Sequence, residues 1–186
     1  FAGRTGQICL LPDHAGGIAG ALYGIGRESP RHHRERYVLA TAAEKLPAGN
    51  WRLANQPAGF DPALGALGWL FAQYRFGRYK KAEPASAHLV CPEGVDAKRI
   101  SALAEGEFLV RDLINTPASD MGPAQLEQAA RDLAARHGAQ ISVITGDELI
   151  ARNFPMIHAV GRAGAEPPRL LDLRFEGRGP RVTLVG

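Results

Sequence analysis

Apolar residues along this chain come in short runs separated by glycine and proline, and the spacing inside each run predicts its structure. Residues 7–11 and 86–91 are short apolar runs that end in proline turns, a pattern typical of buried strands. Between them, Leu64, Leu67 and Phe71 recur three and four positions apart behind a proline, which predicts a helix that begins there. We expect one apolar face of this helix to pack on the strands that precede it.

Glycine is concentrated in residues 16–26, and this cluster admits two interpretations. A dinucleotide-binding loop needs glycines between a strand and a periodic helix, and no such helix follows here. A strand or hairpin is therefore the favoured prediction. Residues 36–45 then predict a short helix, closed by proline and glycine, and a further strand carries Trp51 and Leu53.

The second half of the chain has longer helical patterns. Residues 96–116 place most of their apolar side chains, among them Leu103, Val110 and Ile114, on one side of a long helix that ends at a proline. Another helix is expected from residue 123 to 138, between a first-turn proline and a glycine cap. The remaining predictions are a short helix at residues 146–153 and strands at residues 140–145, 169–177 and 181–186. This order of helices and strands predicts an α/β fold.

Composition places the chain among globular proteins and argues against several partners. With 186 residues and 45% apolar content, one good core or two small ones can form. No apolar run approaches roughly 18 residues, so we predict no membrane span. Cys9 and Cys91 lie in separate runs, as buried, reduced thiols of a cytoplasmic protein would. The net charge of +3 is spread along the chain without a clustered Lys/Arg stripe, which makes nucleic acid an unlikely partner.

The common catalytic and metal-binding motifs do not occur in the sequence, which has no HExxH, CxxC, GxSxG or phosphate-binding loop. His32 and His33 are the one adjacent pair of histidines. A solvated basic loop explains this pair better than a metal site, although contact with a phosphate or an acidic partner stays open. Ser119 and Ser142 lack a recognisable base, and His158 is expected to be a satisfied core or interface histidine.

Structural roles also explain the aspartates that we considered. A helix surface accounts for Asp112, a turn for Asp120, a helix cap for Asp147 and the polar face of a strand for Asp172. The segment 115–123 stops one helix and starts the next, which predicts a hinge between two domains. Taken alone, these residues predict no active site.

Three segments nevertheless carry a family resemblance. Residues 111–134 (RDLINTPASDMGPAQLEQAARDLA) closely resemble the segment that opens the catalytic domain of the cytosol (leucyl) aminopeptidases, a family of dinuclear metallopeptidases. Residues 158–177 are similar to that family's Ala-Val-Gly stretch, and residues 67–80 to the late helix of its amino-terminal domain. The resemblance implies a partial macro-like amino-terminal α/β domain at residues 1–95, a connecting helix at 96–116 and the first α/β elements of the catalytic domain at 117–186.

The resemblance also implies a reaction that this chain does not complete. Family members release amino-terminal residues from peptides with two divalent ions, manganese or zinc, which activate a bridging water, and bicarbonate assists in some of them. In the family, the metal ligands and the catalytic arginine come after the counterpart of residues 181–186, so no catalytic or dinuclear-site residue is assigned here. One site carries over: a structural cation on the backbone oxygens of Leu113, Ile114 and Thr116.

The chain begins at Phe1, close to a predicted strand, and stops after an apolar run, so we expect both ends to be cut and the chain alone to be inactive. The family resemblance implies peptide substrates, a homo-hexamer and a cytoplasmic location. Two alternatives are a non-catalytic module that binds a nucleotide or DNA, and a purely structural assembly domain. Salt-sensitive retention on DNA would favour the first, and oligomerisation of the isolated chain the second.

Overall fold

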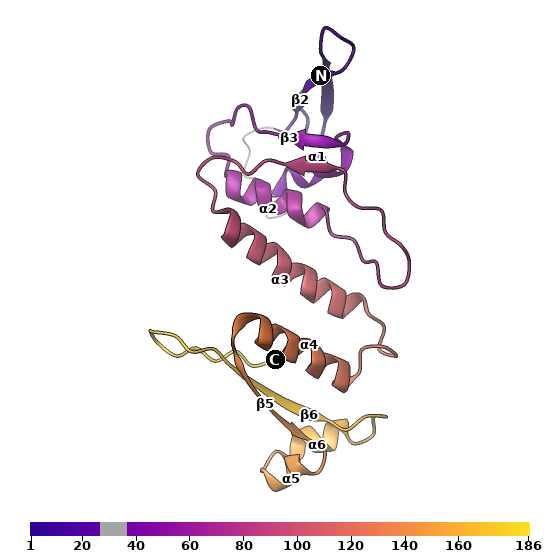
Figure 1. Cartoon of the computed structure of the whole chain (residues 1–186), viewed down its shortest axis with the longest axis vertical. Helices are drawn as coiled ribbons and strands as arrows, with labels where there is room; N and C mark the ends of the chain where they lie inside the picture. Colours follow the sequence, from indigo (N-terminus) through magenta and orange to yellow (C-terminus); the bar gives the residue numbers. More distant parts are fainter. Residues whose placement is uncertain (27–36) are drawn as a thin grey trace. The chain divides into compact units, whose positions relative to one another are not determined.

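The structure is a computed structural model of the chain, and it describes residues 1–26 and 37–186. The adjacent pair His32 and His33 therefore lies outside the described residues. The chain divides into two compact units, Phe1–Asp112 and Leu113–Gly186, each with its own helices and strands (Figure 1). None of the described helices combines the length and the apolar character that crossing a bilayer requires.

The first unit opens with a two-stranded hairpin. β1 (Ile8–Pro12) and β2 (Ile18–Tyr23) pair antiparallel, which confirms the hairpin predicted for the glycine-rich segment. Between the strands, a carboxylate oxygen of Asp13 accepts hydrogen bonds from the backbone N–H groups of Ala15 and Gly17 at 2.8 and 2.7 Å. Local hydrogen bonds of this kind close a turn without help from the rest of the fold.

Tyr23, at the end of β2, ties this hairpin to the segment that leads into the next helix. Its hydroxyl donates a hydrogen bond to the backbone carbonyl of Val38. Burial raises the pKa of the Tyr23 phenol above its usual value, because a phenolate would lose its hydration there. The side chain therefore stays a neutral hydrogen-bond donor well into the alkaline range.

A second strand pair in the first unit is parallel. α1 (Ala40–Lys45) precedes β3 (Gly49–Trp51), and β3 pairs with β4 (Ala87–Leu89). The strand at β4 is confirmed, but it is shorter than expected and is not buried along its length. Ala87 is 1% exposed whereas His88 is exposed, because successive side chains of a strand point to opposite faces.

α2 (Pro62–Ala72) is the central helix of the first unit. It begins at the predicted proline. A cap that was not predicted adds to this start: a carboxylate oxygen of Asp61 accepts hydrogen bonds from the N–H groups of Ala63 and Leu64 at 2.9 and 3.2 Å. Residues 65–69 are all buried. Consecutive buried positions mean that neighbours cover the helix on more than one side, so the expectation of a single buried face was wrong.

Two apolar clusters cover α2. In the first, Trp69 is 2% exposed, packs near Leu39 and the residues of α1, and donates its indole N–H to the Ala87 carbonyl at 3.3 Å. In the second, Leu67 packs with Ile100 of the following helix. Each fully buried Leu or Ile side chain contributes roughly 1.5–3 kcal/mol to folding. The predicted contact with a preceding strand is present at Trp51 of β3, which packs against the first cluster, and contacts with β4 and with the following helix add to it.

α3 (Ala97–Asn115) forms at its predicted position, and the boundary between the two units falls in its last turn. Its apolar residues do not share one packed side. Ala104 is 3% exposed, but Leu103, Val110 and Ile114 are 48%, 49% and 76% exposed. The prediction of a single apolar side was wrong because residues spaced along two different stripes of the helix were counted together.

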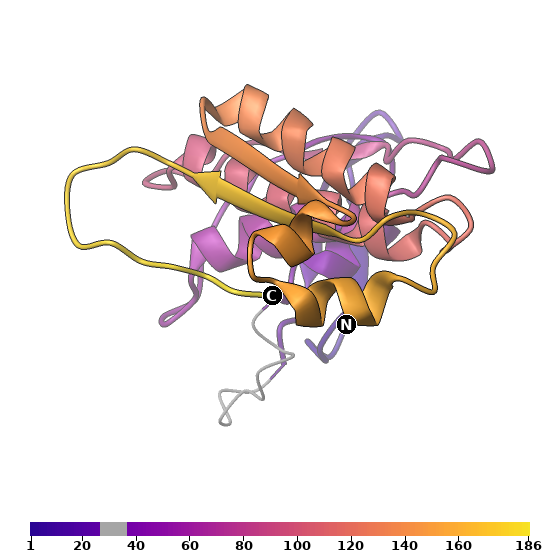
Figure 2. The same cartoon turned by 90° about the horizontal axis from the view of Figure 1, so that it is seen from below.

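The second unit joins one long helix to a strand pair. α4 (Pro123–His137) ends at Gly138, whose φ of 68° is the left-handed conformation that we predicted. β5 (Gln140–Thr145) and β6 (Arg169–Arg174) pair antiparallel, and α4 packs on both strands (Figure 2). The two shorter helices of this unit lie between these strands in the sequence: α5 (Glu148–Ala151) and α6 (Pro155–Gly161). The helices and strands predicted up to residue 174 form close to their predicted positions, and α6 is a helix that was not predicted.

Residues 181–186 depart from the prediction of a buried strand. This segment has no regular secondary structure, and Val182, Leu184 and Val185 are 77%, 92% and 93% exposed. A strand needs a neighbour that exchanges backbone hydrogen bonds with it. No strand in the described part of the chain pairs with residues 181–186. Apolar β-branched residues alone therefore do not make this segment a strand.

Candidate functional site

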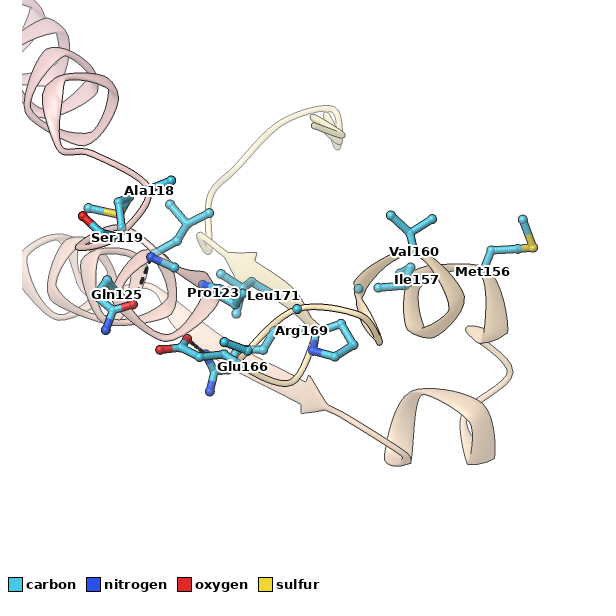
Figure 3. A pocket seen from close by; sticks show the side chains of 17 residues that line it. Ala118, Ser119, Pro123, Gln125, Met156, Ile157, Val160, Glu166, Arg169 and Leu171 are labelled. Carbon is cyan, nitrogen blue, oxygen red and sulfur yellow. Dashed lines mark hydrogen bonds and ion pairs between the residues drawn. The ribbon is translucent and has the colours of Figure 1, made fainter.

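A hollow of about 1060 Å³ lies in the second unit. The loop 118–122, the first turns of α4, the helix α6, the loop 162–168 and the start of β6 line it (Figure 3). Sites for small molecules have volumes of about 300–1,000 Å³. The volume of this hollow is close to the upper end of that range, which makes it a candidate binding site.

The helix α6 supplies an apolar wall. Met156 and Val160 are 74% and 83% exposed, and Ile157 is partly buried beside them. Leu126 of α4 and Leu171 of β6 also line the hollow. Such a surface holds aliphatic groups by removing them from water, and it performs no bond chemistry.

Glu166 forms the polar part of the hollow together with the start of α4. A carboxylate oxygen of Glu166 accepts a hydrogen bond from the Ala124 N–H at 2.8 Å. Gly122 is the N-cap residue of α4 and has no side chain that could accept a hydrogen bond from the first turn. The side-chain oxygen of Gln125 accepts a hydrogen bond from the Gly122 N–H at 3.0 Å. Glu166 thus acts as a distant cap, and its negative charge suits the positive end of the helix.

Arg169 lies between two carboxylates at the same end of the hollow. Its Nε is 2.8 Å from an oxygen of Glu127 and its Nη1 is 3.6 Å from an oxygen of Glu166, while its side chain is 16% exposed. The Nε–H is not aligned for a hydrogen bond and Nη1 is too far from Glu166 for one, so the attraction is mainly one of charge. Glu127 also pairs with Arg131 at 2.7 Å. The charges of Glu127, Glu166, Arg131 and Arg169 are therefore paired with one another.

Nucleophilic hydrolysis is not supported by the side chains of this hollow. Among the described residues that line it, Ser119 is the one hydroxyl, and there is no histidine, cysteine or lysine. A serine nucleophile needs a base within hydrogen-bonding distance. No hydrogen bond joins Ser119 to Glu166 among the described residues, and Ser142 lies on β5 opposite Asp172, away from the lining. The hollow can bind, but it carries no catalytic pair.

The structure gives polar partners to three other residues that the sequence analysis considered: His158, Asp147 and Asp172. The Nε2 atom of His158 is 3.2 Å from a carboxylate oxygen of Asp147, which confirms a satisfied histidine. Asp147 takes the N-cap position of α5, as predicted, but its side chain makes no capping hydrogen bond and contacts His158. Asp172 accepts hydrogen bonds from Arg174 at 2.7 and 3.0 Å, which lower the pKa of the carboxyl and raise the pKa of the guanidinium.

A dinuclear metal site does not fit the described residues. Within residues 1–26 and 37–186, no three His, Cys, Asp or Glu side chains come together to hold a metal ion. We therefore derive no metal-assisted step from this chain. The cation predicted on the carbonyls of Leu113, Ile114 and Thr116 would sit at the end of α3, where the last carbonyls of a helix lack partners inside it. That site stays a prediction.

A smaller hollow of about 240 Å³ lies in the first unit, between α2, β4 and the start of α3. Cys91 and His88 line it, and the Cys91 thiol contacts the Val95 carbonyl at 3.6 Å. Cys91 is exposed and Cys9 is half-buried, so the expectation of buried thiols was wrong, although both cysteines are free. Among the described residues, the Cys91 thiol contacts the backbone carbonyls of Pro92 and Val95, and neither contact joins it to the His88 imidazole.

Comparison with known families identifies both units. The profile described as "M17 aminopeptidase, N-terminal domain" matches residues 1–92, and the profile described as "Cytosol aminopeptidase family, catalytic domain" matches residues 108–186. Among curated proteins, a probable cytosol aminopeptidase of Geobacter sp. (strain M21) is 37% identical over the whole chain, and one of Leifsonia xyli is 32% identical over 94% of it. The chain covers 43% and 38% of these relatives, or about two fifths of their length.

Solved structures agree with the sequence comparison. The cytosol aminopeptidase of Coxiella burnetii superposes with a TM-score of 0.84 at 33% identity, over 96% of this chain and 38% of that one. The bottromycin maturation enzyme BotP, solved in complex with Mn, gives a TM-score of 0.77 at 26% identity over 96% of this chain and 41% of that one. The predicted α/β fold, made of an amino-terminal domain and the start of a catalytic domain, is confirmed.

Proposed function

Since the chain belongs to the cytosol aminopeptidase (M17) family, we propose that it supplies part of a metal-dependent enzyme that releases amino-terminal residues from peptides. The observation that carries this proposal is the order of the two matches, 1–92 and then 108–186, joined through α3. We assign residues 1–95 to the amino-terminal domain, 96–116 to a connecting helix and 117–186 to the start of the catalytic domain.

In this proposal the chain contributes scaffold and the chemistry comes from elsewhere in the enzyme. The described side chains hold no metal-binding cluster, and the hollow of the second unit holds no catalytic pair. When bound, two divalent ions would supply an activated water. The complex of BotP with Mn supports manganese as one candidate, and zinc and bicarbonate stay predictions. This chain's residues position α4, β5 and β6, and we expect no turnover from the chain alone.

Three further properties belong to the same proposal. A homo-hexamer and peptide substrates follow from the family resemblance of residues 111–134. A cytoplasmic location is supported by the names of the relatives. The backbone cation on Leu113, Ile114 and Thr116 would be detected as an anomalous scattering peak at the end of α3.

A chimeric enzyme tests the proposal directly. This chain replaces the matching segment of the Geobacter relative, to which it is 37% identical over its whole length. Hydrolysis of leucine p-nitroanilide is measured with and without Mn²⁺, beside the unaltered relative and the 186-residue chain alone. We expect the chimera to be active and the chain alone to be silent. A folded, metal-loaded but inactive chimera would overturn the proposal, and turnover by the chain alone would overturn its role as scaffold.

A further inference from the structure

A long loop leaves the end of α2 in the first unit. Residues 73–86 connect α2 to β4 without any helix or strand of their own. Figure 1 shows this loop projecting from the end of α2 before it returns to β4. Loops longer than about 12–15 residues without secondary structure are uncommon in compact domains, and many of them bind ligands.

The loop concentrates positive charge. Arg75, Arg78, Lys80 and Lys81 occur within seven residues, and no acidic residue lies among them. Lys80 and Lys81 are exposed, and neither takes part in an ion pair with the described residues. The net charge of the whole chain, +3, does not reveal this local cluster of cations.

Aromatic side chains alternate with these cations. Tyr79 is 54% exposed, its ring centroid lies 5.8 Å from that of Phe76, and the two planes meet at 62°. The Arg78 guanidinium lies 5.7 Å from the Tyr79 centroid, a cation–π distance. The loop therefore presents a supported aromatic ring to solvent between positive charges.

The base of the loop is anchored to its own unit. The Tyr74 hydroxyl donates a hydrogen bond to a carboxylate oxygen of Asp112 at 2.7 Å. The Arg75 guanidinium donates to the carbonyls of Ala72 and Tyr74, both at 2.7 Å. Because these contacts fix the residues that directly follow α2, the loop starts from a defined position, and less order has to be gained on binding.

We propose that the segment Arg75–Lys81 binds single-stranded nucleic acid. Its cations would contact successive phosphates, and a base would stack on the exposed ring of Tyr79, the combination by which proteins hold single strands without reading their sequence. An acidic peptide would use the cations but leave the ring without a stacking partner. The loop also contains no helix to enter a duplex groove. The inference does not depend on aminopeptidase activity.

Fluorescence anisotropy with a labelled oligothymidylate tests this proposal on the full 186-residue chain. We expect saturable binding whose log affinity falls with log salt by about 0.7 per contacted phosphate. Tyr79→Ala is expected to weaken binding by about 5- to 150-fold with little change in that slope, because it removes stacking alone. Lys80→Ala/Lys81→Ala is expected to reduce the magnitude of the slope by about 1.4.

The matched control is Lys98→Ala/Arg99→Ala, which removes two adjacent exposed cations at the start of α3 in the same unit. It should leave affinity and slope within twofold of the parent chain, and circular dichroism checks that every variant is folded. Absent binding at low salt, or an equal loss in the control variant, would overturn the proposal. Equal affinity for a duplex, for polyglutamate or for vesicles of anionic lipid would also overturn it, in favour of a general anion surface.

Discussion

Helix α2 and residues 181–186 are both apolar, yet they lie in opposite environments. Trp69 in α2 is 2% exposed, whereas Leu184 and Val185 are 92% and 93% exposed. Elements on two sides of α2 supply apolar partners, from α1 and β4 in one cluster and from α3 in the other. No strand in the described ranges pairs with residues 181–186. Burial therefore depends on which neighbours a segment has, and the hydrophobicity of the segment alone does not determine it.

The same contrast distinguishes the two units. The first unit has two apolar clusters, while the most deeply buried apolar side chains of the second are Leu149 and Ala134, at 0% and 1% exposed. An isolated pair of strands is marginally stable by itself and gains stability from a helix packed on it, as α4 is packed on β5 and β6. The charged group of Glu166, Arg169 and Glu127 adds polar contacts between α4, β6 and the loop before β6.

Truncating Trp69 in α2 should have the largest effect on the free energy of unfolding. Trp69→Ala is expected to cost about 3–5 kcal/mol of unfolding free energy, because it leaves a cavity in a packed cluster. Leu184→Ala truncates another large apolar side chain, but one that is 92% exposed, and should change the free energy by less than about 0.5 kcal/mol. Urea unfolding of the full chain, followed by circular dichroism, measures both. A comparable loss in Leu184→Ala would mean that residues 181–186 are buried in solution.

Substitutions at two helical glycines should change stability by an intermediate amount. A Cβ at Gly68 of α2 would lie 2.9 Å from the Cα and Cβ of Tyr37, whereas a Cβ at Gly106 of α3 would meet nothing within 4 Å. Gly68→Ala should therefore destabilise the chain by about 1–3 kcal/mol through overpacking. Gly106→Ala should stabilise it by about 0.5–1 kcal/mol, because alanine is the better helix former. Thermal unfolding should show Tm shifts of opposite sign, and shifts of the same sign would refute the close packing of α2.

Local signals explain which elements were predictable. The first-turn proline and the cap at Gly138 define α4, and the first-turn proline and Asp61 define the start of α2. These signals lie within one turn of the residues that they control. Partners at long range were not predictable, so the second covered side of α2 and the exposed stripe containing Leu103 and Val110 were missed.

The candidate site was harder to predict than the fold. Glu166 accepts a hydrogen bond from the N–H of Ala124, which is 42 residues earlier, and Arg169 reaches Glu127 over a similar separation. No pattern of neighbouring residues encodes such pairs. The basic loop was different: its four cations and its aromatic residues stand together in the sequence, but an average over the chain hid them. A count in short windows would have found that loop.

The smallest expected effect concerns the polar contact that joins α4 to the loop before β6. Glu166→Ala removes the acceptor of the Ala124 N–H and one of the two carboxylates beside Arg169, and should cost about 1 kcal/mol, the usual loss for a helix cap. Glu166→Gln keeps an acceptor oxygen and loses the charge, so about 0.3–1 kcal/mol is expected.

The control for this pair is Glu176→Ala, which removes an exposed carboxylate that accepts from Gln140 at 3.4 Å. It should change stability by less than about 0.5 kcal/mol. Hydrogen exchange at the Ala124 amide separates the local effect from a global one, because loss of the cap should speed exchange there before it affects the first unit. If Glu166→Ala leaves this amide as protected as before, the helix start is held by apolar packing, and the contrast between the two units would lose its basis.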